Sequence, residues 1–220
     1  MVKVEPPLAP RTPELPDGLE DAELGDRPLG GLRLERVAIR GADLSDRAAP
    51  DLRLEEALLD GVLLDGTEAA GLQLTDVRVR GGSWAGLRTS RGALVRVEAH
   101  ELRATGADLA ETELSDVVLD TCRLDLASFR HATLSRVVFR DCRLDEADFG
   151  GARLDSVRFE RCVLAGASVH AASFARCELR DCDLSGLVGA GSLTGCRLGR
   201  ADAIGIADLL AEALGLEVVD

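Results

Sequence analysis

The chain has 220 residues and a formal net charge of −13; 46% of its residues are hydrophobic, only 3% are aromatic, and tyrosine is absent. This composition predicts a large but narrow interior filled by Leu, Ala, Val and Cys. The first residues include no apolar run of signal-peptide length, and nowhere are 18 consecutive residues apolar. We therefore expect a cytoplasmic protein without a membrane segment.

Residues 1–31 differ in composition from the rest of the chain. They hold six of the seven prolines, and seven acids against three bases. A mixture this rich in proline and charge is typical of segments that do not build a core of their own. We expect residues 1–31 to be poorly ordered or to lie as an irregular cover over the first coil of the repeats that follow.

The repeat region extends over residues 32–203. Between residues 107 and 184 a Leu or Phe recurs every five positions, interrupted only by Val169, and a small residue usually stands two positions before each. Helices repeat every 3.6 residues and strands every 2.0, so neither produces this spacing. A five-residue unit with two inward positions describes a short extended segment followed by a turn.

A second period of twenty residues groups the units into coils. The four cysteines at 122, 142, 162 and 182 lie twenty apart. Four units therefore make one coil, and the region predicts about 8.6 coils stacked at roughly 4.8 Å, a rod of about 41 Å. Arg47 falls on an inward position, which predicts an outward loop at residues 46–51. Trp84 falls on a large inward position and is expected in the core.

Units such as Ala107-Asp108-Leu109 and Ala147-Asp148-Phe149 resemble those of the pentapeptide-repeat family. The resemblance covers roughly residues 32–203. It implies an all-β solenoid, a right-handed quadrilateral parallel β-helix. The resemblance implies far less about function, because the best understood members mimic duplex DNA and bind type II topoisomerases, while most members have no assigned role.

The cysteines, histidines and glycines are explained by their positions in the repeat and indicate no catalytic or metal-binding site. The six cysteines take small inward positions, Cys196 after a shift of one residue, and the three histidines take outward positions. No C-x2-C pair occurs, and residues 81–85 match the nucleophile motif G-x-S-x-G only in part. Ten glycines stand two residues after an inward position, where a corner with positive φ is expected. We expect no enzyme activity, no catalytic residue, no metal and no cofactor.

Residues 204–220 change to a helical period. The residues Ile206, Leu209, Leu210 and Leu214 form an apolar stripe, Gly215 is the expected helix stop, and residues 216–219 predict a short strand. A short C-terminal α-helical cap over the last coil is the first interpretation, because an open solenoid end would aggregate. The second interpretation is a homodimer joined through the same stripe.

Charge is uneven around the coil. One side, centred on Leu44, Leu64, Leu124, Leu144 and Leu184, carries eight acids against three arginines. We call this side the acidic face; its acids are Asp43, Asp46, Asp65, Asp125, Asp145, Glu146, Asp183 and Asp202, and its bases are Arg103, Arg123 and Arg143.

Two functions follow from these observations. The first is a non-enzymatic protein-interaction scaffold, and by resemblance a DNA-mimicking binder or protector of DNA gyrase. Its candidate contact residues are Asp43, Asp65, Asp125, Asp145, Glu146 and Asp183. The second is a self-assembling structural rod without a topoisomerase role. Neither requires direct binding of nucleic acid or a membrane.

Overall fold

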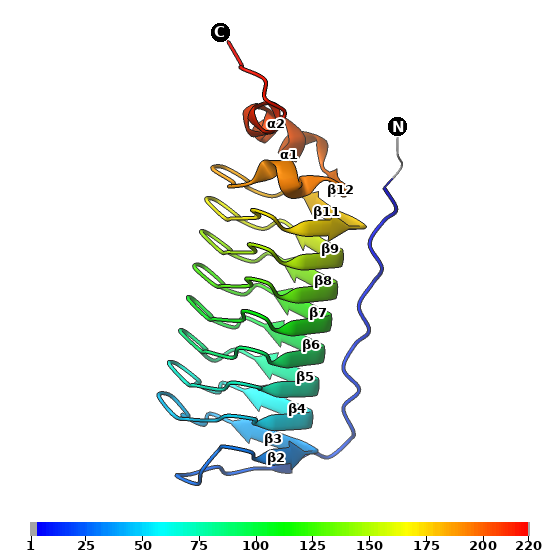
Figure 1. The fold of residues 1–220 in the computed structure, drawn as a ribbon. Coiled ribbons are helices and arrows are strands. Elements are labelled where there is room, and N and C mark those ends of the chain that lie inside the picture. The colour runs from blue at the N-terminus through cyan, green and yellow to red at the C-terminus, as the bar shows by residue number, and fades with distance from the viewer. Residues whose placement is uncertain (1–3, 220) are drawn as a thin grey trace.

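The computed structural model describes residues 4–219, which form a rod of stacked coils with two short helices at one end (Figure 1). The strands are Glu20–Asp21 (β1), Arg33–Glu35 (β2), Val37–Arg40 (β3), Arg53–Asp60 (β4), Gln73–Arg80 (β5), Ala93–His100 (β6), Glu113–Asp120 (β7), Thr133–Arg140 (β8), Arg153–Glu160 (β9), Ser173–Ala175 (β10), Cys177–Arg180 (β11) and Cys196–Leu198 (β12). The helices are the 3₁₀ turn η1 (Ala190–Leu193), α1 (Arg200–Gly205) and α2 (Ala207–Ala213).

All strand pairs in the described residues are parallel, and neighbouring strands from β4 to β9 are offset by twenty residues. Leu74 of β5 lies between Leu54 of β4 and Leu94 of β6, for example. The other two sides of the coil carry single bridges with the same offset, such as Arg103 to Arg123. The predicted twenty-residue coil is therefore confirmed.

Each coil turns its corners at residues with positive φ. All ten glycines expected at corners have this conformation, among them Gly66 (φ +64°) and Gly106 (φ +66°). Many corners carry other residues in the same left-handed region, including Asp116 (φ 59°) in the middle of strand β7. The bend at that position lets one eight-residue strand cover two sides of the coil.

The core is built from ladders of identical side chains. Phe129 stacks on Phe149 at 4.8 Å and Phe139 stacks on Phe159 at 4.9 Å, and the two stacks meet edge to face at 5.7–6.1 Å. Such contacts add to the stabilisation from burial.

The cysteines form a second ladder. The thiol of Cys142 donates to the carbonyl oxygens of Leu119 (3.3 Å) and Arg140 (3.2 Å), and Cys162 repeats the pattern one coil further. All six cysteines are free. Burial raises the pKa of the Cys177 thiol, as expected of a small apolar core residue.

Trp84 is buried, as predicted, and its coil has adapted to its size. Gly82 and Gly92 occupy small inward positions of the same coil, and Ala104 stands above the indole in the next coil. A Cβ at Gly82 would overlap the carbonyl oxygen of Val62. The backbones approach closely there, which keeps the coil stacked on its neighbour.

The prediction of an outward loop at residues 46–51 is wrong. That coil keeps its register, with bridges from Asp43 to Leu63 and from Ala48 to Glu68. The guanidinium of Arg47 instead donates to the carbonyl oxygens of Gly25 (2.8 Å) and Arg27. Residues 20–31 supply these acceptors because β1 pairs with β3 and continues the stack below the first coil.

At the other end the last coil is irregular. Cys196 pairs with Cys177 at an offset of nineteen residues, which confirms the predicted shift of one. Asp202 is buried and accepts hydrogen bonds from the amides of Asp181 (3.0 Å) and Cys182 (2.8 Å), so it pairs the free edge of that coil. It is therefore not part of an exposed acidic face.

The C-terminal helical region begins earlier than expected, at Arg200, and breaks at Ile206. Residues 216–219 form no strand. A strand needs an unpaired neighbour, and α1 and α2 have already carried the chain past the last coil, as Figure 1 shows.

Residues 4–19, which we call the strap, extend along one side of the rod from the first coils to the level of β11 (Figure 1). The N-terminal segment is thus divided: residues 20–31 underlie the first coil, while the strap crosses the length of the rod.

Candidate protein-binding surfaces

The acidic face consists of separate carboxylates in different local settings. Asp43 and Asp183 each accept a hydrogen bond from the backbone amide two residues later, Ser45 and Ser185, at 3.0 Å. Hydrogen bonding to the side chain and backbone of Ser45 lowers the pKa of Asp43, and hydrogen bonding to the backbone and side chain of Ser185 lowers the pKa of Asp183. Both carboxylates are exposed, so both ends of the face carry fixed negative charge.

In the middle of the face the carboxylates are partly neutralised. Asp125 and Asp145 lie one coil apart and both contact Arg143, each at 3.3 Å. Burial, followed by the neighbouring Asp145, raises the pKa of Asp125. The predicted pair is therefore brought together by the structure, and it shares a cation. Glu146 beside it is exposed.

Asp65 is half-buried and bonds to the neighbouring coil. Its Oδ1 accepts hydrogen bonds from the Ser83 hydroxyl (2.5 Å) and from the Ala85 amide (2.8 Å). This carboxylate links two coils and contributes less to a free surface than sequence position indicates. Of the six predicted contact residues, Asp43, Glu146 and Asp183 are the exposed ones.

The predicted C-terminal stripe is divided between core and solvent. Ile206 is buried, and Leu209 and Leu210 pack against the last coil. Leu214 is 77% exposed. Five of the eight exposed large apolar residues in the described chain lie within residues 204–219: Ile204, Leu214, Leu216, Val218 and Val219.

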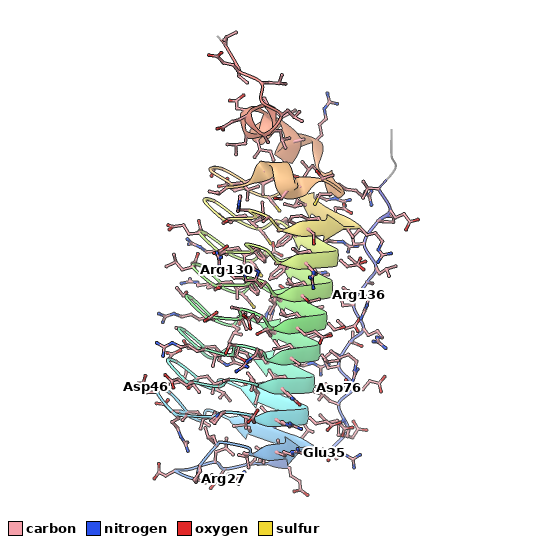
Figure 2. All side chains as sticks on the ribbon, viewed as in Figure 1. Arg27, Glu35, Asp46, Asp76, Arg130 and Arg136 are labelled. Atoms are coloured by element: carbon pink, nitrogen blue, oxygen red, sulfur yellow. The ribbon has the colours of Figure 1, made fainter. Side chains whose placement is uncertain are left out.

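The third surface was missed from sequence. It is the side under the strap, where Arg11 reaches Asp116, 105 residues away, with N–O distances of 3.1 and 2.8 Å to Oδ2. Figure 2 shows Asp76 and Arg136 on the same edge of the rod. A signal for it was present, because prolines recur every third residue from Pro7 to Pro16.

The family model of the pentapeptide repeat region matches residues 103–169, within the most regular part of the rod. Its five-residue unit coincides with the sides and corners described above. This part of the chain is a pentapeptide-repeat region. No curated protein matches its sequence.

Several solved structures resemble this one at low sequence identity. Full-length QnrB1, described as a plasmid-mediated fluoroquinolone resistance protein, is 17% identical over 90% of this chain and 95% of its own, with a TM-score of 0.44. HetL is described as a pentapeptide repeat protein involved in heterocyst differentiation regulation from the cyanobacterium Nostoc sp. strain PCC 7120. It is 18% identical over 79% of this chain and 90% of its own, with a TM-score of 0.31.

The rod is a scaffold of stacked coils with three distinct surfaces. Residues 4–219 contain no cluster of three His, Cys, Asp or Glu side chains arranged to hold a metal ion. Among the same residues, none of the helices has the length and apolarity needed to cross a membrane. His100, His131 and His170 are exposed, as their repeat positions predict.

Proposed function

We propose that the rod is a non-enzymatic scaffold that binds a protein partner through its acidic face. The observation that carries this proposal is the exposure of ionised carboxylates at both ends of one side, Asp43 and Asp183, on a rigid and filled support. A partner with a basic surface of similar length would contact several coils at once.

DNA gyrase is the specific candidate, and it comes from the family resemblance. The net charge per unit length of the acidic face can be compared with that of duplex DNA. Leaving out the buried Asp202, seven carboxylates and three arginines lie along about 34 Å, roughly one net charge per 8 Å, against about 1.7 Å in duplex DNA. Contacts with gyrase would then depend on a few carboxylates, chiefly Asp43, Glu146 and Asp183, more than on a continuous charge row.

A supercoiling assay with purified gyrase, with and without a fluoroquinolone, tests this candidate. The wild-type rod is compared with two double reversals, Asp125→Lys with Asp145→Lys and Asp43→Lys with Asp183→Lys. The matched control is Glu111→Lys with Glu113→Lys, which changes the net charge equally at exposed positions outside the acidic face.

Inhibition of supercoiling or drug protection that only the acidic-face variants lose would support the proposal. An absence of any effect of the wild-type rod at micromolar excess would exclude gyrase as the partner. If the control variant loses the effect equally, the effect depends on the net charge of the rod and not on the acidic face.

A second candidate function, the self-assembling rod, is favoured by the exposed apolar residues at the C-terminal end. Contiguous exposed apolar surface marks sites of association, and a second copy joined end to end would cover Leu214 and Leu216. Residues 204–220 carry four acids and no base. Salt should therefore strengthen the pairing, because it screens the repulsion between the two ends.

Sedimentation velocity measures this directly. Leu214→Asp should give a monomer without loss of folding, since Leu214 is exposed. Leu8→Asp is the matched control, because Leu8 is an exposed leucine of the strap. A monomeric wild-type chain at high salt would contradict the pairing.

A further inference from the structure

The strap lies on the rod with a period of three residues. Its buried or half-buried residues are Val4, Pro7, Pro10, Pro13, Pro16 and Leu19, together with Leu15 outside the series. The remaining strap residues are exposed. A repeat of three is that of a polyproline II helix, and prolines favour that conformation. The strap therefore lays one face of a polyproline helix against the coils.

The polyproline period matches the spacing of the coils. Three residues of such a helix rise about 9.3 Å, and two coils rise about 9.6 Å. The hydrogen bonds follow this register: Arg11 bonds to Asp116, and three residues later the amide of Glu14 bonds to Asp76, two coils below. The rod therefore offers a carboxylate at two successive polyproline turns, whereas the equivalent positions one turn further along are Arg36 and Ser156.

Two carboxylates hold the strap. The side chain of Asp116 has no exposed surface; it accepts from Arg136 Nε at 2.6 Å and from the backbone amide of Arg11 at 3.1 Å, besides the Arg11 guanidinium. Asp76 accepts from Arg96 Nε at 2.7 Å and from the Glu14 amide at 3.1 Å. Each carboxylate is held by an arginine of the rod through both of its oxygens, and its Oδ1 also accepts a backbone amide of the extended chain.

The strap can leave without disturbing the sheet. Within the described residues, its hydrogen bonds to the rod all end on the carboxylates of Asp76 and Asp116, and none is a backbone pair of the coils. The inward prolines lack an N–H and leave no donor unpaired when they move into water. Gly18 (φ +80°) turns the chain where the strap meets β1.

We propose that this side of the rod is a docking surface for extended proline-rich segments of partner proteins, and that the strap is its built-in, displaceable occupant. The partner segment carries proline at every third position and an arginine directly after one of them, as in Pro10-Arg11-Thr12-Pro13. The arginine binds Asp116 and the prolines cover the coils. The tethered strap competes at millimolar effective concentration, so release of the strap controls access.

Fluorescence anisotropy with the full chain tests the proposal, using a labelled synthetic peptide of residues 4–19 as the probe. In the chain, Arg11→Ala weakens the tethered competitor and leaves the rod intact, so the peptide should bind about tenfold more tightly than to wild type. Leu8→Ala, at an exposed strap position, should bind the peptide as wild type does.

Two further arms locate the site. In the first arm, the peptide carrying Arg11→Ala should lose binding to the Arg11→Ala chain. Because both peptides are compared on the same chain, a difference between them cannot come from a change in the rod. Adding Asp116→Asn, or separately Asp76→Asn, to that chain should also weaken peptide binding at least tenfold, with circular dichroism confirming the fold. The two sites provide independent variants if one fails to fold.

Three results would overturn the proposal. They are no binding of the wild-type peptide to the Arg11→Ala chain, equal binding of the two peptides, and binding that is insensitive to both carboxylate variants. Dimers of the unlabelled Arg11→Ala chain that excess peptide dissociates would assign the surface to strap exchange between copies in place of a foreign partner.

Discussion

Asp116 is fully buried and charged, and it accepts five hydrogen bonds from Arg11 and Arg136. Arg136 is the largest cause that lowers the pKa of Asp116, and Arg11 lowers it further. Arg96 does the same for Asp76. Such a carboxylate is stable because its hydrogen bonds replace the water it has lost.

Stability should therefore fall in acid. A carboxyl with a lowered folded pKa contributes stability above its unfolded pKa, near 4, and that contribution disappears as the pH falls toward the folded value. We expect the free energy of unfolding to decline below about pH 4. Asp116→Asn should cost about 2 to 3 kcal/mol at pH 7 and flatten that decline. Urea unfolding between pH 2 and pH 7 measures both, and an unchanged pH profile would contradict the assignment.

Glycine has two different roles in the coils, and they can be separated. A Cβ at Gly106 (φ +66°) would meet no atom within 4 Å, whereas a Cβ at Gly82 (φ +86°) would overlap the backbone of Val62. Gly106→Ala should cost about 1 kcal/mol from backbone strain alone. Gly82→Ala should cost about 3 kcal/mol or more, because overpacking adds to the strain. Equal costs in chemical denaturation would show that close approach is unimportant.

The aromatic ladder is the best packed element of the rod. Phe139 is fully buried between Phe159, which stacks on it, and the edges of Phe129 and Phe149. Phe139→Ala should cost about 3 to 5 kcal/mol through the cavity that it leaves. Arg140→Ala, next to it on the outside, should cost less than about 1 kcal/mol because its ion pairs are partly exposed. Thermal and urea unfolding compare the two, and a ratio near one would argue against the ladder as a main source of stability.

Across the whole molecule, each coil contacts only its neighbours, except where the strap crosses several. Stability should therefore vary along the rod. We expect backbone amides of β7, β8 and β9 to exchange slowest with deuterium and those of α2, which has no buried residue, to exchange fastest. In Phe139→Ala, exchange should rise around β8 and stay unchanged in β4. A uniform rise over all coils would instead indicate one cooperative unit.

The periodic part of this protein was predictable because its contacts are periodic. A side chain and its neighbour in the next coil are twenty residues apart. The core positions therefore appear in the sequence as a repeat of small and large residues, and many of the corners appear as glycines. Even the shift at Cys196 was evident. Arg47 was misplaced because its acceptors, Gly25 and Arg27, belong to a segment outside the repeat.

The candidate surfaces were less predictable, since exposure depends on neighbours. Asp65 and Asp202 count as acids of one side in the sequence, but the structure uses both to bond backbone or hydroxyl groups of adjacent coils. Residues 216–219 had the residues of a strand and no edge to pair with.

The coil, its period and the inward side chains follow from local spacing, since five-residue units can bury their apolar residues in only one way. The course of the strap was decided by tertiary structure. The contact of Arg11 with Asp116 spans 105 residues, and it exists because a polyproline turn and two stacked coils have nearly the same rise. No local pattern encodes that coincidence, which appears only when the rod is assembled.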